Sequence, residues 1–240
     1  MNYVFADLET SHSNVNTLCV LEANFTLYDD RFRKLEELDR KCRIKSTVVP
    51  SIGALMTNGI KVDMLKGANQ TSYNLISEIY ATLKKWEPFC LIGQNFVQFD
   101  AEALIRQYYK SLIPDVYQFK KLPNKIMDTL FLARAAKLID DNSLKCEISA
   151  KGSHLFKLES LARMNNIPHE NKHSAAGDVF ATVMLAKMIK ERVPNLWDAG
   201  LKIAHKSDAQ KFLEKNKIIS HCAYFFGRAR WYSVKYCYYY

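Results

Sequence analysis

The sequence predicts an α/β protein in which helices cover the faces of a mixed β-sheet. Strand-like runs come first along the chain, and helical segments that alternate with a further apolar strand follow them. The run 3–9 is apolar at Val4, Phe5 and Leu8, which is typical of an inner strand. Hydrophobic residues make up 48% of the 240-residue chain, and this supply is sufficient for one sizeable core.

Strands are expected where short apolar runs are bounded by polar turn residues. Segments 3–9, 16–27 and 89–93 meet this criterion. Segment 31–45 fits neither the helical nor the strand period well, and we expect it to pair back as the second arm of a hairpin. From residue 220 the sequence is again strand-like and rich in aromatic residues.

Helices are expected where apolar residues recur at helical spacing and capping residues mark the ends. The segment 72–86 has this pattern, and so does 174–192, where Ser174 is a natural N-cap and Pro194 follows the end. Further helices are expected over 101–110, 128–137, 157–166 and 206–217. Asp128 stands beside Thr129 at such a start, so we interpret it as a cap rather than a metal ligand.

Charge and cysteine usage restrict the class of protein. A net charge of +9 and a pI near 9.1 favour a polyanionic partner such as nucleic acid. The six cysteines are far apart and lack zinc-ligand spacing, so we expect reduced thiols. No apolar run approaches the roughly 18 residues that span a bilayer, and the N-terminus lacks a secretory pattern. We therefore expect a cytoplasmic protein with no membrane partner.

Carboxylates at junctions of the expected elements are candidates for metal binding. Asp7 and Glu9 are two residues apart on a strand, so both side chains leave the same face. Acids on an inner strand cost solvation energy unless cations neutralise them, and Mg²⁺ prefers such oxygen ligands; a solvated edge strand is the alternative. Asp100 lies where a strand passes into a helix, above the carboxyl end of the sheet. A helix cap is the alternative there.

A histidine and a further acid open the long helix expected over 174–192. Asp178 is one turn into that helix, and His173 lies on the loop before it, from which the imidazole can fold over the site. A base of near-neutral pKa suits that place. His169 is the alternative, and we expect its substitution to have the smaller effect on the reaction rate.

Taken in order, these segments resemble the DEDDh exonucleases, a family of RNase H-like 3′→5′ nucleases. The resemblance rests on Asp7-x-Glu9, on Asn95-Phe96-Val97-Gln98-Phe99-Asp100 and on His173-x4-Asp178. Segments 157–162 and 168–182 make it strongest to the bacterial exodeoxyribonuclease I branch. The resemblance implies an RNase H-like exonuclease domain over 1–198. Residues 199–240 would then be a connecting helix and the incomplete start of a C-terminal SH3-like β domain.

The resemblance also implies a two-metal reaction that releases 5′-mononucleotides from the 3′ end of single-stranded DNA. The implied metal ligands are Asp7, Glu9, Asp178 and Asp100. Two Mg²⁺ ions would share Asp7, Mn²⁺ is expected to substitute for Mg²⁺, and His173 would activate the attacking water. The sequence fits the subgroup of the family that has a histidine in this motif, because Ser174 occupies the position where the tyrosine subgroup has its tyrosine.

Substrate contacts are expected at two places. Near the carboxylates, the residues implied for substrate binding are Glu9, Thr10, Asn95 and Phe99. Thr10 would hold the 3′ nucleotide with the backbone amides after the first strand, and Asn95 and Phe99 would support the site. Near the C-terminus, basic and aromatic residues interleave in a way that suits stacking on single strands; they are Arg228, Arg230 and Trp231. The chain departs from the family at Ser11-His12, where an aromatic residue and a glycine are expected.

Other functions remain open at this stage. The metal-binding residues do not distinguish DNA from RNA, since that choice depends on contacts near the 2′ position. An RNA 3′→5′ exonuclease is therefore the alternative enzyme, and an inactive nucleic-acid-binding module of the same fold is the alternative from another class. We expect single-stranded DNA and a single-stranded DNA-binding protein as partners, and a monomeric chain.

Overall fold

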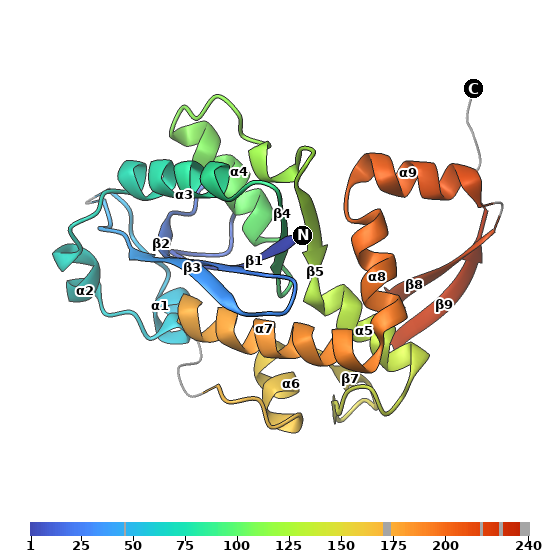
Figure 1. The fold of residues 1–240 in the computed structure, drawn as a ribbon. Helices are drawn as coiled ribbons and strands as arrows, with labels where there is room; N and C mark the ends of the chain where they lie inside the picture. The colour runs from blue at the N-terminus through green and yellow to red at the C-terminus, as the bar shows by residue number, and fades with distance from the viewer. Residues whose placement is uncertain (46, 170–173, 217, 226–227, 236–240) are drawn as a thin grey trace.

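The computed structural model describes residues 1–45, 47–169, 174–216, 218–225 and 228–235 (Figure 1). A five-stranded sheet has the order β3-β2-β1-β4-β5. Its strands are β1 (Asn2–Thr10), β2 (Val20–Tyr28), β3 (Lys34–Lys41), β4 (Phe89–Gly93) and β5 (Lys125–Asp128). The pairs β1–β2 and β2–β3 are antiparallel, whereas β1–β4 and β4–β5 are parallel. The predicted mixed sheet is therefore confirmed.

Helices cover this sheet on both faces, as Figure 1 shows for α3 and α7. On one face lie α3 (Ser72–Trp86) and α4 (Asp100–Lys110). On the other face lie α5 (Thr129–Ile139), α7 (Ala175–Arg192) and α8 (Pro194–Ile203). The remaining helices are α1 (Ile52–Asn58), α2 (Val62–Gly67), η1 (Gln118–Lys120), α6 (Leu158–Met164) and α9 (Lys206–Lys215). The predicted layering of helices on a sheet is thus confirmed.

Alternation along β1 decides which side chains face which helices. One series of β1 side chains faces α3 and α4 and is buried in a core cluster with them. This series comprises Val4, Ala6 and Leu8. Tyr3 and Phe5 belong to a second cluster with residues of α5, α7 and α8. Asp7 and Glu9 continue the second series, so the strand directs both carboxylates toward the side covered by α7.

Several element boundaries differ from the sequence predictions. The strand expected from residue 16 begins only at Val20, because the Leu18 amide donates to the Asn14 carbonyl and closes a turn before it. Segment 31–45 does form the expected hairpin arm, as β3. The helix α8 was not predicted, because Pro194 lies in its first turn rather than in a loop. Its Trp197 is fully buried, and the division predicted at residue 198 falls inside this helix.

Two small antiparallel sheets complete the described structure. One pairs β6 (Glu147–Ile148) with β7 (His154–Leu155), and the other pairs β8 (Ile219–Phe225) with β9 (Arg228–Val234). The second confirms strands beyond residue 220, while their assignment to an SH3-like domain stays a prediction. Among the described residues, no helix combines the length and apolar character needed to cross a membrane.

Candidate active site

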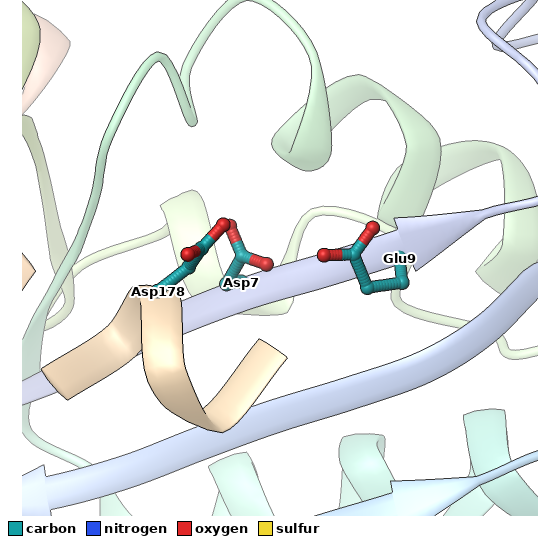
Figure 2. Close-up of side chains that lie close together, drawn as sticks. All are labelled: Asp7, Glu9 and Asp178. Atoms are coloured by element: carbon teal, nitrogen blue, oxygen red, sulfur yellow. The ribbon is translucent and has the colours of Figure 1, made fainter. Parts of the chain in front are cut away.

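Three carboxylates from two elements meet at the centre of the site. Asp7 and Glu9 come from β1 and Asp178 from α7, and one carboxylate oxygen of each lies within 4.8 Å of those of the other two. Figure 2 shows the Asp7 and Asp178 carboxyl groups turned toward one another, with Glu9 farther along the strand. The structure thus brings together three residues that the sequence predicts as metal ligands, and their role as ligands stays a prediction. Their all-oxygen donor set suits a hard divalent cation.

The electrostatics of the cluster favour a bound cation as well. Burial, followed by the Asp100 and Asp178 carboxylates, raises the pKa of Asp7 well above its ordinary value. Burial and Asp178 likewise raise the pKa of Glu9 to about 8. Crowded acids of this kind bind either protons or metal ions near neutral pH. The residues present therefore fit the divalent metal that the sequence predicts.

Asp100 lies beside this group, at the junction of β4 and α4. It is the first residue of α4 and follows the N-cap residue Phe99, so the structure does not support the alternative that Asp100 is the helix cap. Its carboxylate accepts hydrogen bonds from the backbone amides of Leu8 and of Asp100 itself, and burial raises its pKa to about 8. The buried Asp100 carboxylate is thereby anchored to the strand that carries Asp7 and Glu9.

The turn before Asp100 requires particular residues. A Cβ atom on Gly93 would lie 2.7 Å from the Ala6 carbonyl oxygen and 2.7 Å from Phe96 Cβ, so only glycine fits there. Asn95 has a φ angle of 60°, a conformation that asparagine tolerates better than most residues. The sequence pattern of this segment therefore has a structural cause in addition to any contact with substrate.

Asp128 has a second role that the sequence did not indicate. It caps α5 by accepting the Leu130 amide at 2.9 Å, which confirms the predicted cap. It also accepts the amides of Asn95 at 2.9 Å and Val97 at 3.0 Å. Its buried carboxylate thus fixes the turn that leads to Asp100, and such hydrogen bonds to a charged group are among the stronger ones in proteins.

The two candidate histidines differ in what the structure describes. His173 falls outside the described residues, so its assignment as the base remains a prediction. His169 Nε2 lies 2.5 Å from Asp178 Oδ1, and its side chain is 8% exposed. Ser174 caps α7 by accepting the Gly177 amide, as predicted. The histidine that contacts the cluster is thus His169, which the sequence analysis gave as the alternative to His173.

The predicted substrate residues occupy two separate regions. The Thr10 hydroxyl donates to the His12 carbonyl at 3.1 Å in the loop that follows β1. Asn95 is exposed beside the turn, and Phe99 packs partly buried against the core. The remaining three lie exposed on β9 and not in the carboxylate cluster; they are Arg228, Arg230 and Trp231.

Sequence reasoning missed Glu22, which lies directly opposite Glu9 on β2. Its side chain is buried although it carries a charge. The signal was present in the sequence, because this glutamate interrupts an otherwise apolar run, Val20-Leu21 before it and Ala23 after it.

Comparisons with known proteins relate this chain to nucleases. No protein-family model matches it. Exodeoxyribonuclease I of Buchnera aphidicola subsp. Schizaphis graminum is 28% identical over 236 residues, which are 96% of this chain and 48% of that protein. This chain spans less than half the length of the relatives that it matches. The similarity in sequence is thus to the exodeoxyribonuclease I proteins.

Solved structures share the fold. E. coli Exonuclease I in complex with a dT13 oligonucleotide has a TM-score of 0.88 at 23% identity, covering 97% of this chain and 51% of that chain. An ExoI/SSB-Ct complex has a TM-score of 0.85 at 23% identity, covering 96% of this chain and 51% of that chain. The arrangement of helices and sheet is therefore the one found in these nucleases.

Proposed function

We propose, from the likeness of this chain to exodeoxyribonuclease I in sequence and fold, that it is a metal-dependent 3′→5′ exonuclease. Its proposed reaction is the degradation of single-stranded DNA to 5′-mononucleotides. The observation that carries the proposal is the convergence of Asp7, Glu9 and Asp178, whose carboxylate oxygens lie within 4.8 Å of one another. Such a group binds hard divalent cations, and Mg²⁺ is the proposed ion, with Mn²⁺ as its substitute.

The carboxylates have different roles in the proposed reaction. Asp7, Glu9 and Asp178 would hold the metals, and Asp100 would complete their surroundings from α4. When bound, two such ions stabilise the attacking and leaving oxygens of an in-line displacement at phosphorus. The protein positions its ligands from the rigid elements β1 and α7, and burial of the side chains limits their freedom before substrate arrives.

Two histidines that precede Asp178 in the sequence have proposed roles in the reaction, one in proton transfer and one in orienting a metal ligand. His173, on the segment before α7, would take the proton of the water that attacks the phosphorus. His169 would orient Asp178, because its Nε2 lies 2.5 Å from Asp178 Oδ1. A hydrogen-bonded partner of this type fixes the direction of a ligand carboxylate.

A cavity of about 390 Å³ beside the Asn95 turn supports a path for the single strand. Its lining includes Asn95, Arg134, Lys157 and Tyr224. The Arg134 guanidinium carbon lies 4.0 Å from the centre of the Tyr224 ring, so a cation and an aromatic ring stand together there. Basic and aromatic groups on such a path suit phosphates and unstacked bases. We propose that the strand continues toward Arg228, Arg230 and Trp231.

The proposed partners follow from the neighbours' complexes. One of the similar structures is E. coli Exonuclease I with a dT13 oligonucleotide and another is an ExoI/SSB-Ct complex, which supports single-stranded DNA and a single-stranded DNA-binding protein as partners of this chain. A monomeric chain in the cytoplasm is also proposed. The cysteines of the described segments are free, in accord with a reducing compartment.

One experiment tests the proposed function. The purified chain is incubated with single-stranded DNA and RNA of equal length, each with a free or a blocked 3′ end, in Mg²⁺ or in EDTA. The proposal predicts 5′-mononucleotides from 3′-free DNA in Mg²⁺ alone. Preferential digestion of RNA would assign an RNA exonuclease instead, and binding of DNA without any digestion would assign a binding module.

A further inference from the structure

Glu22 lies on β2, the strand beside the central strand β1, next to the proposed metal ligands but not among them. In the register of the sheet it is the direct partner of Glu9 on β1 and of Lys41 on β3. Only 3% of the residue is exposed. A buried charged residue is rare unless it is paired and hydrogen-bonded, so its contacts indicate what it does.

Each oxygen of the Glu22 carboxylate has a partner on a different element. Oε1 accepts the backbone amide of Ala175 at 3.2 Å, and Oε2 lies 3.2 Å from Lys41 Nζ. Lys41 comes from the edge strand β3, and Ala175 is the first residue of α7. One side chain thereby links β2, β3 and the N-terminus of α7.

The position of the contact on α7 matters because Asp178 is on the same helix. Ala175 and Asp178 are three residues apart, so they lie on one side of the first turn. The first amides of a helix lack partners within the helix. Ser174 satisfies the Gly177 amide, whereas the Ala175 amide is satisfied from the sheet by Glu22.

We propose that Glu22 is a positioning residue, which holds the N-terminus of α7 at the sheet and thereby sets the separation of Asp178 from Asp7 and Glu9. The inference rests on the proposed function in that a divalent cation is the ligand of those three carboxylates. Glu22 acts through the hydrogen bond from Ala175 and not as a further ligand. Besides burial, the Glu22 carboxylate also helps to raise the pKa of Asp7 and of Glu9. The Lys41 ammonium at 3.2 Å offsets part of the charge of Glu22, and we assign the positioning to the hydrogen bond and not to this charge.

Two conservative substitutions separate the hydrogen bond from the charge. Glu22→Gln keeps an acceptor oxygen at the same reach and removes the charge. Glu22→Asp keeps the charge and withdraws the acceptor by one methylene. Glu37→Asp is the matched control, because Glu37 lies on β3, pairs with Lys34 and accepts hydrogen bonds from Asn24 and Thr26, all within the same sheet.

The measurement is calorimetric titration of each 240-residue variant with Mn²⁺ in the absence of DNA, together with the Tm in EDTA. We expect Glu22→Asp to weaken Mn²⁺ binding by about tenfold, as loss of a partner that orients a metal ligand does. Glu22→Gln is expected to bind within about threefold of the wild-type chain, and Glu37→Asp to bind as the wild type does. Glu22→Gln is thus expected to retain the Mn²⁺ affinity that Glu22→Asp loses.

Equal or greater weakening by Glu22→Gln would show that the charge acts, and would overturn the inference. Wild-type Mn²⁺ affinity in both variants would overturn it too, whatever their Tm, since Glu22 would then serve stability alone. Absence of Mn²⁺ binding by the wild-type chain would contradict the proposed function itself. The two failures are distinguishable. If the wild-type chain binds Mn²⁺ and Glu22→Asp binds it equally well, only the inference about Glu22 is wrong.

Discussion

The imidazole Nε2 of His169 lies 2.5 Å from Oδ1 of Asp178. This contact joins the segment before α7 to one of the three converging carboxylates. It gives His169 a route to influence metal binding without any part in proton transfer, because a hydrogen-bonded partner fixes the orientation of a ligand. The roles of the two candidate histidines can therefore be separated by what each variant changes.

For the histidines, we predict that His173→Ala lowers kcat at saturating Mn²⁺ by about a hundredfold or more, the usual contribution of a general base. His169→Ala should leave kcat within about threefold and raise the half-saturating Mn²⁺ concentration by about tenfold. Hydrolysis rates measured across a Mn²⁺ series give both quantities. A reversed pattern, with kcat lost in His169→Ala and kept in His173→Ala, would place the base four residues earlier.

The raised pKa values predict a pH-dependent stability for the metal-free chain. Glu9 and Asp100 have ordinary pKa values of 4.5 and 3.8, and in the folded chain both rise to about 8. The folded state therefore binds more protons than the unfolded state between roughly pH 4 and pH 8, and the free energy of unfolding falls as the pH rises through that window. Mn²⁺ should reverse the loss by replacing the protons.

The check is the Tm in EDTA and in Mn²⁺ at about pH 6 and about pH 8.5. We expect Mn²⁺ to raise the Tm more at the higher pH, where it does not compete with protons. Asp100→Asn should show a smaller fall of the metal-free Tm between the two pH values. A fall as large as in the wild-type chain would mean that Asp100 does not hold the excess proton.

For the turn before α4, we predict that Asp128→Ala destabilises the chain by about 3 kcal/mol, because the backbone amides of Asn95, Val97 and Leu130 lose their acceptor. The same variant should lower kcat by about tenfold or more, since Asp100 follows the turn that Asp128 holds. Urea unfolding and rate measurements on folded protein test both statements. Asp140→Ala, at an exposed acid, is the control. If Asp128→Ala had the kcat of the wild-type chain, the turn held by Asp128 would not contribute to the reaction.

On β9, the basic and aromatic residues should differ in their dependence on salt. Arg228→Ala and Arg230→Ala are each predicted to raise KM for single-stranded DNA and to reduce the slope of log KM against log salt by about 1. Trp231→Ala should raise KM with an unchanged slope, because stacking releases no counterions. Steady-state kinetics over a salt series provide the test. An effect on kcat in place of KM would assign these residues to the reaction centre.

The sequence predicted the elements whose local signals agree with their surroundings. The segment 72–86 became α3 with the same ends, because Thr71 caps it and apolar residues recur at helical spacing. The Asp7 and Glu9 pair was identified because acids on an apolar strand are costly without a function. The resemblance to the DEDDh exonucleases, and not a local signal, then implied that Asp178 would join them.

Contacts between distant segments were not predictable from the sequence. Asp128 was recognised as a cap from its neighbour Thr129, but its bonds to Asn95 and Val97 arise only when β5 pairs with β4. Pro194 was interpreted as the end of a helix, although it also suits the first turn of the next one. The short helix α1 was missed although Ile52, Leu55 and Met56 stand at helical spacing, because seven residues hold too few repeats of that pattern to distinguish a helix from a loop.

The most direct test of the account is the release of 5′-mononucleotides from single-stranded DNA by the wild-type chain, Asp7→Asn, Asp178→Asn and the control Asp39→Asn. Asp39 is an exposed acid on β3, outside the carboxylate group. In Mg²⁺ we predict wild-type rates for Asp39→Asn and losses of at least about a thousandfold for the other two, with a Tm in EDTA that is unchanged or higher. Undiminished release by a folded Asp7→Asn or Asp178→Asn chain, with contaminating nuclease excluded, would contradict the assignment of these carboxylates to the metals.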